Sequence, residues 1–451
     1  MIKTEINNFN EAEAYLNDMP RFTSKHSIRE TRQFLEKLGS PDLSMKIIHA
    51  AGTNGKGSTC AYLDSILREA GIHTGLFTSP HLVDICERFR IDGKQISHDE
   101  FYDAFMDIYD RLDWDAAAKD SAVFYHPTYF EFLFFMAMQI FKNAGVEWCI
   151  LETGLGGLLD ATNSIKTKEA AVITRIDLDH TEYLGNTKAE IAVQKAGIIA
   201  KGKPVVYGDY VPEASEAIIK EAKKYESGKL YPVGKQNIKV LLISPQYIDF
   251  SLSDGYYKDV SLCLDTIAVY QPENAALAVK AIEAAGLTER ISPETLQRGI
   301  NKCRWAGRME EVLPDVFVDG AHNPDGIRAF LDTVKRDGCG DRKKRRLLFG
   351  VVSDKDHLEM VKEIADSKLF DKIVIAPLKT GRSLDTEKLL NEFNDYPNMD
   401  ITVRTSVSKA FDRMLEEKAA LKESKDDFRI YIAGSLYLAG EIKGKIENDK
   451  L

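Results

Sequence analysis

The chain has 451 residues, 44% of them hydrophobic, which is too long for one compact core, so we expect two domains. Its 70 acidic and 60 basic side chains give a formal net charge of -10, which argues against a nucleic-acid-binding protein because such domains carry clustered basic surface. The six scattered cysteines suggest neither a disulfide framework nor a zinc site, and no apolar run could cross a bilayer, so we expect a cytoplasmic protein without a membrane partner.

Residues 1–44 are predicted to be helical. Phe34, Leu35 and Leu38 recur at helix spacing before Gly39-Ser40-Pro41 ends the pattern. A packing role is sufficient to explain this segment.

The next segment runs from a β-branched strand beginning at Ile47 into a glycine-rich turn and then into an amphipathic helix that ends before Gly71. The turn and the start of the helix read Gly52, Thr53, Asn54, Gly55, Lys56, Gly57 and Ser58. Glycines allow backbone N–H groups to face one concavity, and the helix N-terminus and Lys56 add positive charge. We therefore predict a triphosphate-binding loop rather than an ordinary strand-to-helix turn. Because Gly57 separates the lysine from Ser58, we expect Mg²⁺ to use other ligands as well.

Polar side chains follow three further predicted strands. Ser79 follows the strand at 72–77, Glu152 ends the strand at 147–152, and His180 follows the strand at 170–176. Ligands gather at the carboxyl ends of strands in α/β sheets, so these residues are expected near a ligand, and the Glu152 carboxylate is a candidate metal ligand. Ser79 could instead only form a turn, and His180 could be a capping or core histidine. Lys195, on the next helix, would by itself be a surface lysine.

Arg88 lies in the segment Cys86-Glu87-Arg88-Phe89, where a guanidinium could bind a substrate carboxylate. An isolated arginine is more often a solvated surface group. The apolar helix beginning at Tyr129 is explained by core packing, although its exposed end could contact an aromatic ligand.

Short alternating runs between residues 230 and 264, with Asp254-Gly255 as a hairpin signal, predict a small β appendage. Helices are then predicted from Tyr270 to Gly286, carrying Asn274, and from Ser292, which has the pattern of an N-cap followed by proline.

A domain boundary is predicted near residues 302–308, which divides the chain into 1–303 and 304–451. Beyond it, strand-like runs at 316–318, 346–349, 373–375, 401–403 and 430–432 alternate with helix-length segments, which predicts a second, Rossmann-like sheet. No Gly-x-Gly-x-x-Gly follows, so dinucleotide binding is not supported. Asp319, His322 and Ser435 follow strand ends and are expected to face one crevice.

The motifs Gly-Thr-Asn-Gly-Lys-Gly-Ser, Thr-Ser-Pro-His, Asp-Ala-Thr-Asn, Asp-His, Lys-Ala-Gly-Ile and Trp-Ala-Gly-Arg occur in this order. Matching segments, these motifs among them, recur from residue 47 to residue 440, and in them the chain resembles the folylpolyglutamate synthases and dihydrofolate synthases of the Mur ligase superfamily. The resemblance implies an α/β fold with an N-terminal P-loop ATPase-type domain and a C-terminal Rossmann-like domain. Three residues depart from the family pattern, namely Cys86, Leu158 in place of an arginine, and Gln194.

The resemblance also assigns roles to residues. For the metal, the expected ligands are Ser79, Glu152, His180 and a carbamylated Lys195. The residues expected to bind ATP are those of the loop together with Asn274 near adenine, Arg308 and Asp319. The residues expected to bind the other substrates are Arg88, His322 and Ser435. The expected catalytic residues are Lys56, Lys195, Asp319 and His322.

The implied enzyme uses ATP to convert a substrate carboxylate to an acyl phosphate, which the amine of L-glutamate attacks to form an amide. The expected substrates are a folate, dihydropteroate or both, and the expected cofactors are ATP, Mg²⁺ at two sites, the carbamylated lysine and a monovalent cation. We expect a monomer. The alternatives are an enzyme with folylpolyglutamate synthase activity alone, a Mur-type cell-wall ligase, and a non-catalytic ATP-dependent switch.

Overall fold

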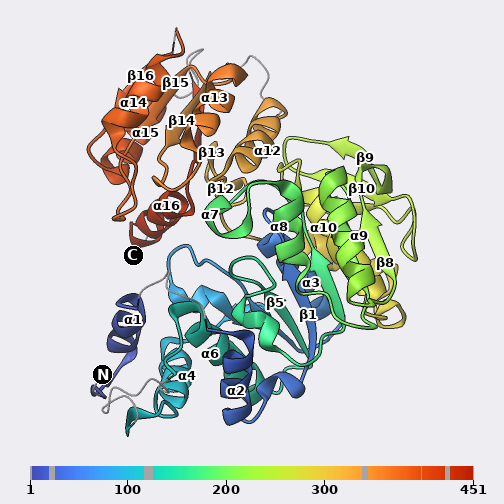
Figure 1. Ribbon diagram of the computed structural model, residues 1–451. Helices are drawn as coiled ribbons and strands as arrows, with labels where there is room; N and C mark the ends of the chain where they lie inside the picture. The colour runs from blue at the N-terminus through green and yellow to red at the C-terminus, as the bar shows by residue number, and fades with distance from the viewer. Residues whose placement is uncertain are drawn as a thin grey trace. The chain divides into compact units, whose positions relative to one another are not determined.

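The computed structural model describes residues 3–19, 26–115, 125–337, 344–397, 399–421 and 427–449. The chain divides into two compact units (Figure 1). Unit 1 comprises Met1–Ile238, Leu252–Val260 and Glu273–Lys302, and unit 2 comprises Lys239–Ser251, Ser261–Pro272 and Cys303–Leu451.

Unit 1 is built on one large sheet. Its strands are β1 (Lys46–Ala51), β2 (Thr74–Phe77), β3 (Phe89–Ile91), β4 (Lys94–Gln95), β5 (Trp148–Glu152), β6 (Ala170–Ile173), β7 (Val205–Gly208) and β8 (Leu230–Val233). Among the described residues these form an eight-stranded sheet in the order β4-β3-β2-β5-β1-β6-β7-β8. The six strands from β2 to β8 in this order are parallel, and β3 and β4 add an antiparallel edge. The predicted phosphate loop therefore leaves the middle of a parallel sheet.

Helices cover both faces of this sheet. They are α1 (Phe9–Asn17), α2 (Ile28–Lys37), η1 (Pro41–Leu43), α3 (Lys56–Glu69), η2 (Ile85–Arg88), α4 (His98–Tyr109), α6 (Tyr129–Asn143), η3 (Ala161–Ser164), α7 (Thr181–Leu184), α8 (Lys188–Ala196), α9 (Pro212–Lys224), η4 (Lys235–Asn237), α10 (Gln271–Ala284), η5 (Thr288–Arg290) and α11 (Pro293–Lys302). One aromatic-rich core joins α1, α2, α4 and α6 to β1, β2 and β5. A second, aliphatic core joins α8 and α9 to β6 and β7. Helix α3 packs on β1, β2, β5 and α11.

Unit 2 contains two sheets. The small one has the order β11-β10-β9, from β9 (Ile238–Ile243), β10 (Ile248–Leu252) and β11 (Leu262–Leu264). The large one has the order β12-β13-β17-β14-β15-β16, from β12 (Glu310–Leu313), β13 (Val316–Val318), β14 (Lys344–Phe349), β15 (Lys372–Ile375), β16 (Ile401–Val403) and β17 (Phe428–Ala433). Its helices are α12 (Pro324–Lys335), α13 (His357–Ser367), α14 (Thr386–Asn394), α15 (Val407–Leu421) and α16 (Leu436–Asn448), and Figure 1 shows them around this sheet.

The predicted α/β class with two sheets is confirmed, as are the helices in 1–44 and the five strands predicted after residue 304. Gly71 follows α3 with φ 71°, as a glycine that ends a helix should. The predicted β appendage exists as β9 to β11, and most of it groups with unit 2, although it precedes residue 304. Its predicted start at residue 230 is wrong, because Leu230–Val233 pairs with β7 as β8 of the large sheet. The division at residue 304 itself stays a prediction. Within the described residues, no helix has both the length and the apolar composition to cross a membrane.

A buried polar network ties β1 to the loops beside it. Lys168 Nζ donates to the carbonyl of Ile198 at 2.8 Å and lies 3.1 Å from His49 Nδ1, and His49 Nε2 lies 2.8 Å from Thr162 Oγ1. Because the Thr162 hydroxyl donates to Asp160 at 2.6 Å, it accepts from His49, which leaves Nδ1 as an acceptor for Lys168. Burial lowers the pKa of Lys168 to about 7 and also lowers the pKa of His49. Lys168 and His49 therefore hold little positive charge above neutral pH.

This network predicts a pH-dependent stability. The folded protein releases the Lys168 proton near pH 7, whereas the unfolded chain keeps it to roughly pH 10.4. Between these values the unfolded chain binds more protons, so the free energy of unfolding rises with pH, by up to about 1.4 kcal/mol per pH unit from this group. Lys168→Met should flatten the rise, as measured by urea unfolding between about pH 7.5 and 9.5.

Lys203→Met is the matched control, because Lys203 is partly exposed and pairs with Glu169 at 3.1 Å. It should keep the wild-type slope. A wild-type slope in Lys168→Met would mean that Lys168 does not release its proton near pH 7.

Candidate functional site

The predicted phosphate loop joins the centre of the sheet to α3. Gly55 is the residue before the helix and has φ 90°, a left-handed conformation that glycine adopts without strain. A Cβ atom at Gly55 would lie 2.2 Å from Asn274 Oδ1, and one at Gly52 would lie 1.8 Å from Thr174 Oγ1. Both glycines are therefore required by close approach, and the predicted residue Asn274 lies against the loop.

The loop is also fastened to the segment after β6. Thr53 N–H donates to the carbonyl of Arg175 at 2.9 Å, and Thr53 Oγ1 donates to the carbonyl of Asp177 at 2.9 Å. Thr174 Oγ1 donates to the carbonyl of Asn54 at 2.7 Å. The loop backbone is thus held by neighbouring residues, while the first turn of α3, with Lys56, Gly57 and a buried Ser58, follows it directly.

Two lysines far apart in sequence converge on this loop. Lys56 Nζ donates to the carbonyls of Gly52 at 3.0 Å and Thr53 at 3.2 Å. Lys195 Nζ, from the last turn of α8, donates to the same Gly52 carbonyl at 2.7 Å and is buried. Together with the N-terminus of α3 they make a strongly positive position, which suits a polyphosphate.

A buried carboxylate lies at the end of the neighbouring strand. Glu152 ends β5, opposite Ala50 of β1, and its Oε2 accepts the backbone N–H of Ser79 at 3.0 Å. The buried thiol of Cys60 in α3 interacts with both signs of charge. Burial and the Glu152 carboxylate raise its pKa, and Lys56 lowers it. The predicted ligands Glu152 and Ser79 are therefore adjacent, and Glu152 lies close to the phosphate loop.

The remaining predicted ligand, His180, follows β6. It is the residue before α7 and has φ 50°, and its Nε2 lies 4.0 Å from Asp179 Oδ1. The same segment holds an ion pair that the sequence did not indicate, between Asp177 and Lys188 at 2.9 Å. Asp177 also has its backbone N–H bonded to Thr53 Oγ1 at 3.1 Å, so the pair adjoins the loop.

The donor set fits a hard divalent cation. Glu152 offers carboxylate oxygens, Ser79 a hydroxyl and His180 an imidazole, all at carboxyl ends of parallel strands. Thr153 Oγ1, directly after Glu152, is buried and has no hydrogen-bond partner among the described residues. A buried hydroxyl without a partner is costly, so a water or ligand oxygen is expected there.

Arg88 is buried rather than solvated. Its Nε donates to His81 Nδ1 at 3.0 Å, and its guanidinium lies 5.7 Å from the centre of the Tyr129 ring. The carbonyl of Arg88 accepts Thr78 N–H at 3.1 Å, which holds the Thr-Ser-Pro-His segment against η2.

In unit 2, both carboxylate oxygens of Asp319 accept hydrogen bonds from residues of the same unit. Oδ2 accepts from Tyr270 Oη at 2.6 Å and from Met309 N–H at 3.0 Å, and Oδ1 accepts from Ala321 N–H at 2.8 Å. Burial raises the pKa of Asp319, and the nearby Arg308 guanidinium lowers it. Tyr270 is a partner that sequence reasoning missed, because 49 residues separate it from Asp319.

His322 and Ser435 lie at the ends of adjacent strands. β13 and β17 pair in parallel, and the N–H of Gly434 donates to the carbonyl of Ala321 at 2.9 Å, which brings the two following loops together. His322 Nδ1 lies 2.8 Å from the carbonyl of Gly320, and Ser435 caps α16 by accepting Tyr437 N–H at 3.1 Å. His322 and Ser435, which were predicted to face one crevice, therefore follow strands at the same edge of the sheet.

Leu158, which replaces a family arginine, packs on the end of α8. A Cβ atom at Gly197 would lie 2.3 Å from Leu158 Cα, and Leu158 N–H donates to the carbonyl of Gln194 at 2.7 Å. The backbone at this position supports the helix that carries Lys195.

Comparison with known proteins adds to this geometry. Residues 307–436 match the family model of the Mur ligase glutamate ligase domain. Over 363 residues the chain is 33% identical to the dihydrofolate synthase/folylpolyglutamate synthase of Bacillus subtilis, which covers 79% of this chain and 82% of that protein. It is 30% identical over 447 residues to the folylpolyglutamate synthase of Lacticaseibacillus casei, covering 97% of this chain and 98% of that protein.

Among solved structures, the chain is similar to the bifunctional folylpolyglutamate synthase/dihydrofolate synthase of Yersinia pestis complexed with AMPPNP and Mn ion. The TM-score is 0.79 at 28% identity, and the match covers 98% of both chains. Because these matches extend over most of the chain, and the phosphate loop and both sheets are present, this protein belongs to the folylpolyglutamate synthase/dihydrofolate synthase family of the Mur ligase superfamily.

Proposed function

We propose that this protein is an ATP-dependent ligase that joins L-glutamate to folates, and also to dihydropteroate, through an acyl phosphate. The observation that carries the proposal is the convergence of Lys56 and Lys195 on the Gly52 carbonyl, beside the Glu152–Ser79 pair. This arrangement combines a polyphosphate site with a carboxylate for a metal, which phosphoryl transfer requires.

In this proposal the loop N–H groups and the N-terminus of α3 bind the triphosphate, and Lys56 neutralises charge on the transferred phosphoryl group. Ser79, Glu152 and His180 would hold Mg²⁺ at two sites, where the ion supplies electrostatic stabilisation and alignment of the phosphate oxygens. Asn274 would contact the adenine side of the nucleotide, and a monovalent cation completes the proposed cofactors. Arg88, buried beside Tyr129, would bind a substrate carboxylate.

We further propose that Lys195 is carbamylated. Because Lys56 and Lys195 donate to one oxygen, their ammonium groups lie within roughly 6 Å of each other, which costs about 3 kcal/mol of repulsion at an effective dielectric constant near 20. Addition of CO₂ to the neutral amine, with release of one proton to solvent, replaces this repulsion by attraction. It also supplies another hard oxygen ligand.

For unit 2 we propose that His322 and Ser435 bind the incoming glutamate, and that Arg308 and Asp319 act on ATP. Asp319 or His322 would orient the attacking amine. The proposal includes the division into an ATP-binding domain, 1–303, and a glutamate-ligase domain, 304–451, in a cytoplasmic monomer that binds no nucleic acid.

The Bacillus subtilis relative carries both activities in its name, whereas the Lacticaseibacillus casei relative carries only folylpolyglutamate synthase. The second candidate is therefore an enzyme limited to folates. Both reactions activate a carboxylate and use the same amine, and their substrates differ by about one glutamate, or roughly 4–7 Å of chain.

We predict that purified protein forms amide and ADP with dihydropteroate and with tetrahydrofolate, each assayed with ATP and glutamate. Lys56→Ala should lower both rates together by about 10²-fold or more, because both use the same phosphoryl-transfer charge. Lys46→Ala, at the exposed start of β1, is a control that should leave both rates near wild type. Turnover of only one substrate would exclude the dual function, and turnover of neither would exclude the ligase.

We predict that Gly55→Ala weakens nucleotide binding about tenfold. The new methyl group would clash with Asn274 Oδ1, and the loop would require alanine to adopt a left-handed conformation. Together these effects cost at least about 1–2 kcal/mol of free energy. Calorimetric titration with ADP measures this. Gly71→Ala carries the same backbone strain at φ 71° but has open space around it, so it should lower stability without changing ADP affinity.

We predict that Lys195→Ala reduces amide formation by at least about 10²-fold, and that added short carboxylates restore part of it by replacing the carbamate oxygens. Crystals of an ATP–metal complex grown with bicarbonate should show carbamate density on Lys195. Lys201→Ala, an exposed lysine paired with Glu226, should show neither loss nor rescue. An unmodified amine in that complex would contradict carbamylation.

A further inference from the structure

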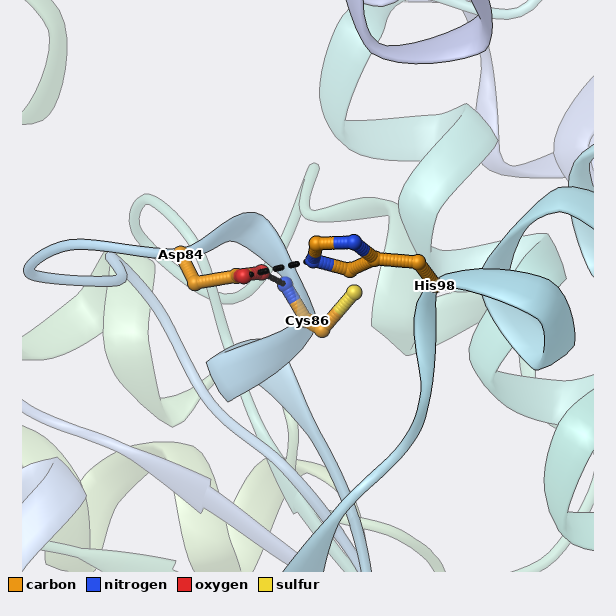
Figure 2. Close-up of side chains that lie close together, drawn as sticks. All are labelled: Asp84, Cys86 and His98. Atoms are coloured by element: carbon orange, nitrogen blue, oxygen red, sulfur yellow. Dashed lines mark hydrogen bonds and ion pairs between the residues drawn. The ribbon is translucent and has the colours of Figure 1, made fainter. Parts of the chain in front are cut away.

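A second group of metal-binding side chains lies in unit 1 outside the proposed ATP site. Asp84, Cys86 and His98 each offer one ligand atom, and these atoms all lie within 4.8 Å of one another. Figure 2 shows the carboxylate, the sulfur and the imidazole turned toward a common point. They come from two elements, since Asp84 and Cys86 belong to the η2 turn and His98 is the first residue of α4.

The ligand atoms are held in place by further contacts. Asp84 Oδ1 accepts the backbone N–H of Cys86 at 2.8 Å, and Oδ2 lies 2.8 Å from His98 Nε2. The His98 ring stacks on Phe9 of α1, with centroids 3.7 Å apart and planes 4° apart. Orientation of ligands by neighbouring groups is a property of protein metal sites, and here it exists before any ion binds.

The three side chains differ in exposure. Cys86 is 0% exposed, whereas the side chains of Asp84 and His98 are 31% and 54% exposed. The thiol is therefore the innermost of the three ligands, and an ion can reach the site from the side of His98. Glu13 of α1 contributes further negative charge, because it interacts electrostatically with Asp84, His98 and Cys86.

We propose that Asp84, Cys86 and His98 bind a transition-metal ion of the Zn²⁺ class, at a site separate from the Mg²⁺ ligands near the phosphate loop. Sulfur, imidazole and carboxylate donors together select a borderline-soft ion such as Zn²⁺, whereas Mg²⁺ prefers oxygen ligands alone. Glu13 or water takes the fourth position. On binding, the Cys86 S–H bond breaks, its proton leaves to solvent, and a sulfur–metal bond forms, with no change of oxidation state.

Binding of a tetrahedral Zn²⁺ requires a small change in the distance between two of the ligand atoms. Ligand atoms about 2.0–2.3 Å from a tetrahedral Zn²⁺ are roughly 3.3–3.7 Å apart, so the 2.8 Å Asp84–His98 contact must widen by about 0.5 Å. Burial and the Asp84 carboxylate raise the pKa of the Cys86 thiol, so the apo site holds a thiol and the ion must displace its proton. Once bound, the ion joins α4 to the turn that carries Arg88.

Cobalt titration of the full chain tests this site. The metal-free protein, kept in excess Mg²⁺ to occupy oxygen-ligand sites, is titrated with Co²⁺, which binds zinc sites and absorbs in the near ultraviolet when a thiolate is a ligand. We expect one equivalent of Co²⁺ to produce this thiolate absorption, Zn²⁺ to abolish it, and Zn²⁺ to raise the melting temperature. Absence of the thiolate absorption would overturn the proposal.

Variants assign the ligands. Cys86→Asn and Cys86→Ser should each abolish the absorption, and His98→Asn should weaken Co²⁺ binding at least tenfold. His73→Asn is the matched control, because His73 pairs with Asp92 at 2.7 Å in the same way but is not part of a thiol-containing group among the described residues.

Cys60→Ser tests the other relevant thiol, which lies near Glu152. It should leave the absorption unchanged. Loss of absorption in Cys60→Ser, or its persistence in both Cys86 variants, would assign the metal elsewhere and overturn the proposal. Circular dichroism of each metal-free variant verifies the fold, and His98→Asn, at a half-exposed position, carries the test if the Cys86 variants do not fold.

Discussion

The Gly52 carbonyl is the point on which the site of unit 1 depends. It accepts hydrogen bonds from both Lys56 and Lys195, so the loop backbone fixes where two positive charges lie. The loop can do this because Gly52 and Gly55 leave room for Thr174 and Asn274, and because Thr53 is bonded to the segment after β6. A side chain at either glycine would clash with these neighbours in the loop that carries this carbonyl.

Charge is distributed unevenly around this point. Two lysines, the buried carboxylate of Glu152 and the Asp177–Lys188 pair lie at the carboxyl ends of the strands, and Glu152, Asp177 and Lys195 among them are buried, which strengthens their electrostatic interactions. The His49–Lys168 pair on and beside β1 is buried as well, but burial lowers the pKa of both groups, so these two side chains carry little positive charge above neutral pH.

In unit 2, as in unit 1, strand pairing and hydrogen bonds position loops at one edge of a sheet. Parallel pairing of β13 and β17 brings two loops together at one sheet edge. Asp319, in the first of these loops, accepts hydrogen bonds from three groups of unit 2. These bonds orient the backbone that carries His322. Asp319 is thus a structural anchor of its loop, whatever further role it has with ATP.

The sequence alone determined the parts that depend on local pattern. The period of apolar residues gave α6 and the five parallel strands of unit 2, and glycine spacing gave the phosphate loop, because these features follow from backbone geometry over a few residues. The same patterns predicted Lys56 and Glu152 as site residues, whereas Lys195 was predicted only through the resemblance to a family, and all three remain predictions for the site. Short edge strands such as β4 and β12 were not foreseen, since two to four residues carry little periodic signal.

Only the tertiary structure decided which distant groups meet. Lys195 reaches a carbonyl 143 residues away, Tyr270 reaches Asp319, and Lys168 meets His49 across 119 residues, and no local spacing encodes such contacts. Cysteine spacing gave no sign of a zinc site, yet the fold places Cys86 beside His98 and Asp84. The physical reason is that side-chain chemistry is set by the residue, whereas burial, pKa and ligand geometry arise from neighbours that the sheet and its helices bring together.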